Sequence, residues 1–348
     1  MNNTLIPKTL LVIRNDRLGD FLLAWPAFAL LRSALPETTI EALVPNYTAP
    51  LAAICPSIDQ VLLEPAGDSG IRKYHALRRV VRDSGAQWAL VFATRLPLAL
   101  ALWGAGIPRR LAPATKVDQL FYTDRLLQRR SRSIKPEWAY NVDLARHALT
   151  LWRCPVPDLS GPPYLRFDPG LVQTRRDAFL LGQRITGHPK LVFLHPGDGG
   201  SAENWPPEAY AYFANRLLED PRVLLVVTSG PGEERVAEQV LKGLGDRARA
   251  RARLYPSTEG IVRFAEHVAF ADLWISGSTG PLHLAGALNR PTVAFYPRRH
   301  SGRALRWETI NEEKNRLAFE VAPGESGRTG LDRAARLIRE RFLPSSGP

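Results

Sequence analysis

Four loops hold the residues whose types and spacing could do chemistry, and each loop follows a short apolar run. The first is Arg14–Asp20 (RNDRLGD), which ends on a carboxylate at the start of a helical stretch. A positioned carboxylate can act as a general base and take the proton of an attacking hydroxyl. An aspartate at a helix start is also a typical N-cap, which accepts a backbone N–H and complements the helix dipole. The residues alone leave both roles open for Asp20.

The second loop, His195–Ser201 (HPGDGGS), and the third, Ser276–His283 (SGSTGPLH), are suited to hold a phosphate. Their glycines leave backbone N–H groups free to face an anion. In the third loop, Ser278 or Thr279 can cap a helix that Pro281 begins, and such a helix start is an anion site. A structural turn is the alternative for both loops. The residues predicted to contact the anion are Asp198, Gly199, Gly200, Ser201, Ser278, Thr279, Gly280 and His283.

The fourth loop, Ser229–Glu234 (SGPGEE), places two acidic residues at a helix start. Carboxylates there usually interact with the helix dipole. A carboxylate that follows a strand of a nucleotide-binding sheet can instead hold ribose hydroxyls, which makes Glu233 and Glu234 candidates for that role. The chain has no GxSxG or HExxH motif, and its N-terminal half has no GxGxxG motif. These absences argue against serine-hydrolase, zinc-protease and NAD-dependent chemistry.

Short apolar runs alternate with amphipathic stretches along both halves, which is typical of βαβ units with parallel sheets. The predicted strands are 10–13, 39–44, 60–63, 88–93, 190–194, 222–228, 273–276 and 292–296, and the predicted helices are 21–35, 71–83, 206–218, 233–244, 258–269, 281–288 and 330–342.

We expect an α/β chain of two doubly wound domains, 1–153 and 171–348, joined by a proline-rich linker over 154–170. The C-terminal helix could pack back on the N-terminal domain. In open parallel sheets, ligands bind outside the carboxyl ends of the strands, which is where the four loops lie.

Composition narrows the function classes. The 348 residues include 46 Lys and Arg against 34 Asp and Glu, a net charge of +12. This excess fits an anionic substrate or membrane surface, with an arginine-rich coding bias as the alternative source. Nucleic acid is the weakest partner, because no recognition motif is present. Two cysteines exclude a disulfide scaffold and are expected to be reduced, as in cytoplasm. The most apolar stretch, 86–107, is interrupted by Arg95 and Pro97 and is not expected to span a membrane.

Taken together, the loops make the chain similar to glycosyltransferase family 9, the bacterial ADP-heptose:lipopolysaccharide heptosyltransferases. The resemblance implies a GT-B fold, in which two Rossmann-like domains face each other across a cleft. It also implies an inverting transfer from a nucleotide sugar, with no metal and no cofactor. The similarity is carried by 14–20 with Pro26 and Ala27, by 107–110 (IPRR), by 195–197 followed by 204–207 (NWPP), and by 279–288 (TGPLHLAGAL).

The resemblance also implies roles for particular residues. Asp20 matches the family's proposed base, and the loops of the second domain match its donor diphosphate site. Two positions depart from the family pattern: Glu203 stands where several members carry lysine, and Ser278 where members often carry aspartate. The candidates to supply the missing cation are Arg298, Arg299, Arg303 and Arg306.

A basic stretch, 125–135 (RLLQRRSRSIK), fits the acceptor, which the resemblance makes an anionic glycan or glycolipid received by the N-terminal domain. A solvated basic loop is the alternative. The residues predicted to meet the acceptor's phosphates, or anionic lipid headgroups, are Arg17, Lys116, Arg129, Arg130 and Arg132.

We therefore predict a cytoplasmic glycosyltransferase at the inner face of the cytoplasmic membrane, with no nucleic-acid partner. Its predicted reaction moves heptose from ADP-heptose to a lipopolysaccharide-type or related surface-glycan acceptor. The alternatives on the same fold are a nucleotide-sugar epimerase or hydrolase, which would consume donor without acceptor, and a non-catalytic nucleotide-sugar binder.

Overall fold

The computed structural model describes residues 6–67, 70–114, 117–197, 205–298, 302–321 and 328–344. The chain forms two compact units, an N-terminal unit (Met1–Leu165) and a C-terminal unit (Arg166–Pro348). The boundary between them lies inside the proline-rich segment in which we expected a linker. Both cysteines are buried free thiols.

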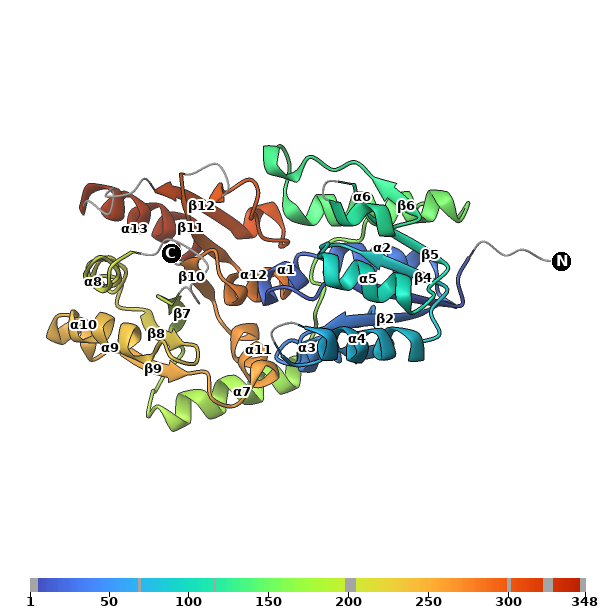
Figure 1. Ribbon diagram of the computed structural model, residues 1–348. Coiled ribbons are helices and arrows are strands. Elements are labelled where there is room, and N and C mark those ends of the chain that lie inside the picture. Colours follow the sequence, from blue (N-terminus) through green and yellow to red (C-terminus); the bar gives the residue numbers. More distant parts are fainter. Residues whose placement is uncertain are drawn as a thin grey trace. The chain divides into compact units, whose positions relative to one another are not determined.

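The N-terminal unit is a parallel six-stranded sheet with helices on its faces (Figure 1). Strands β1, β2 and β4 are buried along almost their whole length, as their continuous apolar runs require. The unit comprises β1 (Thr9–Ile13), α1 (Leu18–Leu22), α2 (Trp25–Ala34), β2 (Thr39–Val44), α3 (Ala49–Ala52), β3 (Gln60–Leu63), α4 (Ile71–Asp83), β4 (Trp88–Val91), α5 (Leu96–Gly104), β5 (Arg109–Pro113), η1 (Val117–Phe121), β6 (Asp124–Leu126), η2 (Arg130–Arg132) and α6 (Glu137–Leu151).

The C-terminal unit is a second parallel six-stranded sheet, also flanked by helices. Its core is formed by the strands together with α8, α9 and α13. The unit comprises α7 (Pro169–Gly182), β7 (Lys190–His195), α8 (Pro207–Leu217), β8 (Val223–Ser229), α9 (Glu234–Lys242), α10 (Asp246–Arg249), β9 (Ala252–Pro256), α11 (Ile261–Ala269), β10 (Leu273–Gly277), α12 (Gly280–Ala287), β11 (Thr292–Pro297), η4 (Glu313–Asn315), β12 (Arg316–Val321) and α13 (Arg328–Phe342).

The two sheets have the same topology. The strand order is β3-β2-β1-β4-β5-β6 in the N-terminal unit and β12-β11-β10-β7-β8-β9 in the C-terminal unit. Both follow the Rossmann order 3-2-1-4-5-6, and all neighbouring strands are parallel. The expectation of two doubly wound α/β domains is therefore confirmed. In each sheet the order reverses once, between β1 and β4 or between β7 and β10, and this switch point is where such sheets bind ligands.

One local prediction was wrong. The helix predicted over 21–35 is broken at Leu23 and Ala24, because Pro26 has no N–H to continue α1 and instead lies in the first turn of α2. The last helix packs within the C-terminal unit. Its apolar face, which includes Leu331 and Ile338, is part of the core of the C-terminal unit, and α13 packs on α8.

Candidate functional site

Three of the four candidate loops follow strands that form the switch points of the two sheets, namely β1, β7 and β10. In the N-terminal unit, the loop after β1 carries Asp20, and the loop after β4 is tied to it because Arg95 donates to the Asn15 carbonyl at 2.7 Å. In the C-terminal unit, the loops after β7 and β10 begin at Pro196 and Ser278. The sequence-based placement of these loops at the carboxyl ends of their strands is thus confirmed.

A buried arginine organises the loop after β1. Arg14 is only 3% exposed and directs its guanidinium at three carboxylates. Its Nη2 donates to Asp20 Oδ1 at 2.5 Å, its Nε donates to Asp16 Oδ1 at 2.9 Å, and its Nη1 lies 3.4 Å from Glu137 Oε1. A buried cation of this kind requires such partners, because desolvation without them is costly. Arg14 therefore fixes the position of the Asp20 carboxylate.

The N-cap interpretation of Asp20 was wrong. The N-cap of α1 is Arg17, no side chain caps this helix, and Asp20 lies inside its first turn with its carboxylate on Arg14. Burial raises the pKa of Asp20 to about 6 against the opposing charge of Arg14, and the nearby carboxylates Asp16 and Glu137 raise it further. A carboxylate with this pKa is ionised at neutral pH and is still basic enough to accept a proton.

Helix α6 supplies further partners of Arg14, and the sequence had not identified them. Glu137 Oε1 accepts from Arg130 at 2.6 Å, and Asn141 Nδ2 donates to the Leu23 carbonyl at 3.1 Å. Glu137 and Asn141 are one helical turn apart and continue into a buried apolar stripe at 144, 145 and 148. Two polar residues on the buried stripe of a helix are the signal that could have identified them.

In the C-terminal unit, Glu233 and His195 meet at the carboxyl ends of β7 and β8. Glu233 Oε2 accepts from the Gly230 N–H at 3.0 Å and lies 3.4 Å from His195 Nε2. His195 Nδ1 is hydrogen-bonded to Thr228 Oγ1 at 3.0 Å. Gly197 leaves room for this contact, because a Cβ there would lie 2.1 Å from Glu233 Oε2. The structure thus distinguishes the two acidic candidates: Glu233 is held beside His195 at the end of β7, whereas the adjacent glutamate, Glu234, is exposed.

The start of α12 differs from the expected capped helix. Thr279, one of the two predicted capping residues, is the N-cap residue, but its hydroxyl makes no capping bond. Pro281 lies in the first turn, as expected. His283 is buried, and burial lowers its pKa to about 4, so its imidazole is neutral at physiological pH. Its Nδ1 has no hydrogen-bond partner among the described residues. His283 can therefore serve an anion as a neutral donor but not as a cation.

The predicted acceptor residues separate into two groups. Arg17, Arg129 and Arg132 are exposed. Arg130 instead points inward, to Glu137 and to Gln128 Oε1 at 2.8 Å, so its guanidinium is part of the Arg14 cluster. Several candidates lie outside the described residues, namely Lys116, Asp198, Gly199, Gly200, Ser201, Glu203 and Arg299.

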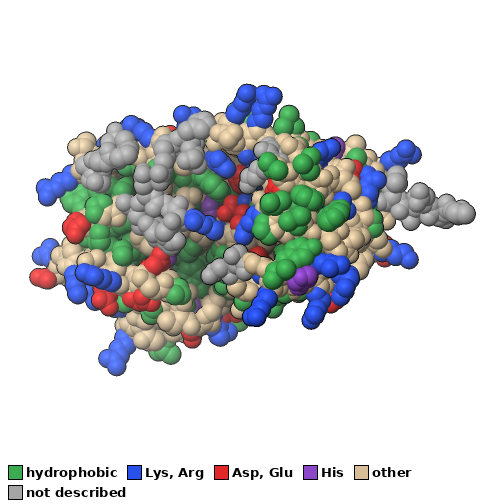
Figure 2. Space-filling model, in the orientation of Figure 1, with side chains coloured by type: hydrophobic (Ala, Val, Ile, Leu, Met, Phe, Trp, Pro, Cys, Tyr) green, Lys and Arg blue, Asp and Glu red, His purple; other side chains and the backbone are tan. Residues whose placement is uncertain are grey.

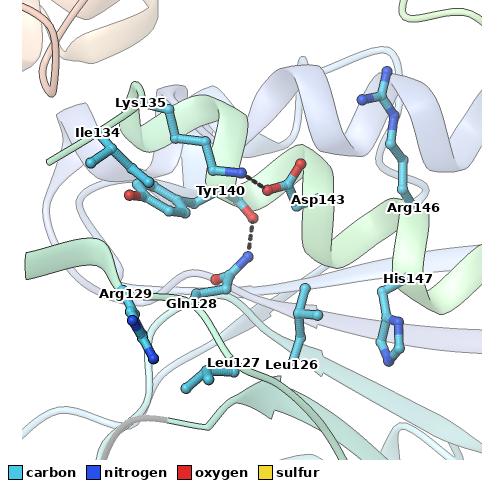
Figure 3. A pocket seen from close by; sticks show the side chains of 10 residues that line it. All are labelled: Leu126, Leu127, Gln128, Arg129, Ile134, Lys135, Tyr140, Asp143, Arg146 and His147. Atoms are coloured by element: carbon cyan, nitrogen blue, oxygen red, sulfur yellow. Dashed lines mark hydrogen bonds and ion pairs between the residues drawn. The ribbon is translucent and has the colours of Figure 1, made fainter. Parts of the chain in front are cut away.

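A pocket of about 440 Å³ lies between the basic stretch and α6 (Figure 3). The side chain of Gln128 donates to the Tyr140 carbonyl at 2.7 Å on its wall, and Lys135 is ion-paired with Asp143. The other residues that line the pocket are Leu126, Leu127, Arg129, Ile134, Arg146 and His147.

Metal-binding residues do not gather in this chain as far as the structure describes it. No group of three or more His, Cys, Asp or Glu side chains is placed to hold an ion within the described ranges. In the same ranges, no helix is long and apolar enough to cross a bilayer.

Comparisons with known proteins agree on one family. The model of glycosyltransferase family 9 (heptosyltransferase) matches residues 74–323. The chain is 41% identical over 328 residues to a Haemophilus influenzae protein whose name is "Putative glycosyltransferase". The alignment covers 93% of this chain and 92% of that protein. It is 24% identical over 313 residues to lipopolysaccharide heptosyltransferase 2 of Escherichia coli, covering 85% of this chain and 87% of that enzyme.

A solved structure shares the whole fold. The E. coli ADP-heptose lipopolysaccharide heptosyltransferase II superimposes with a TM-score of 0.77 at 19% identity, covering 96% of this chain and 98% of that one. The two parallel sheets of this chain, with their flanking helices, are the GT-B arrangement that the resemblance implied. The chain belongs to glycosyltransferase family 9, has the GT-B fold, and is a glycosyltransferase related to the lipopolysaccharide heptosyltransferases.

Proposed function

We propose that this glycosyltransferase moves heptose from ADP-heptose to a hydroxyl of a lipopolysaccharide core or related surface-glycan acceptor, with inversion and without a metal. Asp20 is the general base of this proposal. The observation that carries it is the Asp20 carboxylate, which is 16% exposed, is held by Arg14 at 2.5 Å and has its pKa raised to about 6. The family match begins at residue 74, so the role of Asp20 rests on this geometry and not on the match.

The chemistry of the transfer requires a base and an anion site. A sugar hydroxyl is a poor nucleophile at neutral pH, so Asp20 takes its proton as the oxygen attacks the anomeric carbon. The bond from that carbon to the diphosphate breaks in the same step, which inverts the configuration. Negative charge then grows on the diphosphate, and backbone N–H groups at a helix start can stabilise it. We assign this task to the first turn of α12 and to Gly199–Ser201, which lie outside the described residues.

The pH profile of the reaction tests the base. Burial raises the pKa of Asp20 to about 6, and only the ionised form can accept a proton. We expect kcat/KM to be level above this pH and to fall about tenfold per unit below it. Steady-state rates across this range measure the acidic limb of the pH profile, where kcat/KM falls. Circular dichroism at each pH confirms that the protein stays folded. A limb centred near 4, the ordinary value for an aspartate, would contradict the assignment.

We assign the donor's ribose to Glu233. Its carboxylate is fixed by the Gly230 N–H and lies beside His195 at the end of β7. In Rossmann-like sheets, a carboxylate after a strand at this edge accepts hydrogen bonds from ribose hydroxyls. Gly197→Ala would push this carboxylate away, since the new Cβ would overlap it.

Donor binding by this variant is therefore expected to weaken about 10–100-fold, the value of one charge-assisted hydrogen bond. Thermal-shift titrations with ADP, ADP-heptose, UDP and GDP measure it. The wild type is expected to shift with ADP and ADP-heptose only.

The control for this prediction is the neighbouring acid. Glu234 is exposed, so Glu234→Gln is expected to bind donor like the wild type, whereas Glu233→Gln is expected to resemble Gly197→Ala. Equal affinities for all four proteins would remove Glu233 from the donor site. A shift with UDP or GDP alone would reject ADP-heptose as the donor.

The acceptor's anionic groups are assigned to the N-terminal unit. The pocket between the basic stretch and α6 presents Arg129 and Arg146 beside apolar side chains, which suits an amphiphilic anion such as a glycolipid phosphate. Its wall residue Gln128 also accepts from Arg130, which is bonded to Glu137 of the Arg14 cluster. Hydrogen bonds therefore connect this pocket to the cluster that holds Asp20.

A further inference from the structure

An exposed apolar surface lies on the N-terminal unit, built mainly by α5. This helix (LPLALALWG) has no polar side chain at all. Its inner side chains, such as Leu98 and Leu102, belong to the core of the unit. On its outer side, Leu96 is exposed and Trp103 is 58% exposed. A surface helix normally pairs a buried apolar stripe with a polar outer face. The outer face of α5 is therefore as apolar as a helix face that packs against another apolar surface.

The 3₁₀ helix η1 enlarges this surface. Val117 is 76% exposed and Leu120 is 74% exposed. The ring of Phe121 lies 6.0 Å from that of Trp103, centroid to centroid, so η1 packs against the end of α5. We call the surface formed by Leu96, Trp103, Val117 and Leu120 the α5–η1 patch. Figure 2 shows hydrophobic side chains gathered over this region of the N-terminal unit, with Lys and Arg side chains around them. Contiguous apolar patches of this kind mark interaction sites.

The segment that contains the patch is strongly basic. The segment 70–126, which contains it, has ten Lys and Arg against three Asp and Glu, a net +7 of the chain's +12. Of those acids, Asp118 is buried and Asp124 is ion-paired. Helix α4, which packs beside α5, and strand β6 present exposed arginines that have no ion-pair partner among the described residues, namely Arg72, Arg79 and Arg125.

We propose that the α5–η1 patch docks this protein onto an anionic lipid bilayer. Trp103, Val117 and Leu120 enter the interfacial region, and the surrounding arginines meet the headgroups. Tryptophan at the headgroup level, aliphatic insertion and cationic attraction are the complementary elements of reversible membrane binding. A second copy of the chain fits the patch poorly, because it would bring the same excess of positive charge against it. This inference stands apart from the proposed function, since docking needs neither donor nor acceptor.

Vesicle co-sedimentation of the full chain tests the docking. We expect the wild type to sediment with phosphatidylcholine vesicles that contain about one third phosphatidylglycerol, and less so at high salt. Val117→Ser with Leu120→Ser is expected to weaken this binding at least about tenfold, because each aliphatic side chain that leaves water contributes about that factor. Both side chains are largely exposed, so the variant is expected to keep the wild-type melting temperature. Arg72→Ala with Arg79→Ala is expected to weaken binding about fivefold per residue.

The matched control is Leu181→Ser on α7 of the C-terminal unit, where the leucine is also highly exposed but lies outside the patch. Unchanged binding by this control, together with loss in the patch variant, supports the proposal. Absence of wild-type binding, or equal binding by the patch variant, overturns it. A dimer in sizing chromatography that the patch variant converts to monomer would also overturn it, because the patch would then be a contact between copies. None of these readouts depends on turnover.

Discussion

Replacing Asp20 by asparagine is expected to lower kcat about 10²–10⁴-fold, the usual contribution of a general base. The amide oxygen of the variant can still accept from Arg14, so the geometry of the loop after β1 is expected to remain. What is lost is the ability to take a proton from the acceptor hydroxyl. Donor affinity is expected to change less than about threefold, because Asp20 lies in the N-terminal unit and acts only in the chemical step. Steady-state kinetics with ADP-heptose, together with thermal-shift titration of ADP, separate the two effects.

Asp16→Asn is the control for this substitution. Asp16 accepts from the same guanidinium at 2.9 Å, so its replacement removes an equal charge from the same arginine. If charge loss around Arg14 alone lowered the rate, both variants would be equally slow. We expect Asp16→Asn to keep kcat within about tenfold of the wild type. A rate for Asp20→Asn above a tenth of the wild-type rate, or equal to that of Asp16→Asn, would show that Asp20 is not the base.

The strands that build the two switch points could be predicted from the sequence alone. The runs over 10–13, 190–194 and 273–276 each match one of these strands to within one residue. Continuous apolar runs of this length are what a strand buried on both faces requires. Once the strands alternate with helices, the parallel sheet follows, and with it the position of each loop at a carboxyl end.

The partners of Asp20 could not be predicted in the same way. Glu137 is 123 residues from Arg14 along the chain, and the sequence does not show that α6 packs against α2 and returns to the loop after β1. No helix was predicted over α6, so the burial of Glu137 on its inner face could not be predicted either. Tertiary burial thus decided the environment that sets the pKa of Asp20.

The C-terminal unit shows the same difference between what local sequence predicts and what only the folded chain reveals. The sequence correctly placed a helix near Pro281, but hydroxyl capping of that helix was a local inference that the structure does not support. The choice between Glu233 and Glu234 depended on the close approach of Gly197 to one carboxylate. That contact joins the loops after two different strands, so only the folded chain reveals it.

Removal of the Glu137 carboxylate is expected to have the largest effect on stability. Glu137 is 3% exposed, and its Oε1 accepts from Arg130 at 2.6 Å and lies 3.4 Å from Arg14. Glu137→Ala leaves a cavity. It also removes one carboxylate partner from the guanidinium groups of Arg14 and Arg130. Breaking a buried ion pair from one side costs about 3–5 kcal/mol, which corresponds to a fall in Tm of roughly 6–20 °C for a domain of this size. Thermal unfolding followed by circular dichroism measures the fall.

Asp143→Ala on the same helix is the matched control. Asp143 is paired with Lys135, but both side chains are about one-third exposed, so this ion pair is expected to contribute less than about 1 kcal/mol. Tm is therefore expected to fall much less than in Glu137→Ala. Equal losses in the two variants would mean that the Arg14 cluster does not stabilise the N-terminal unit.

Glu137→Gln separates the electrostatic role of this residue from its packing. Glutamine keeps the shape and an oxygen that can accept from Arg130, so the fold is expected to lose less stability than in Glu137→Ala. Burial would still raise the pKa of Asp20 and Arg14 would still oppose it, but the negative charge of Glu137, which also raises this pKa, would be gone. The acid limb of kcat/KM is therefore expected to move to lower pH than in the wild type. A limb that stays in place while stability falls would make Glu137 a packing residue and leave burial alone to set the basicity of Asp20.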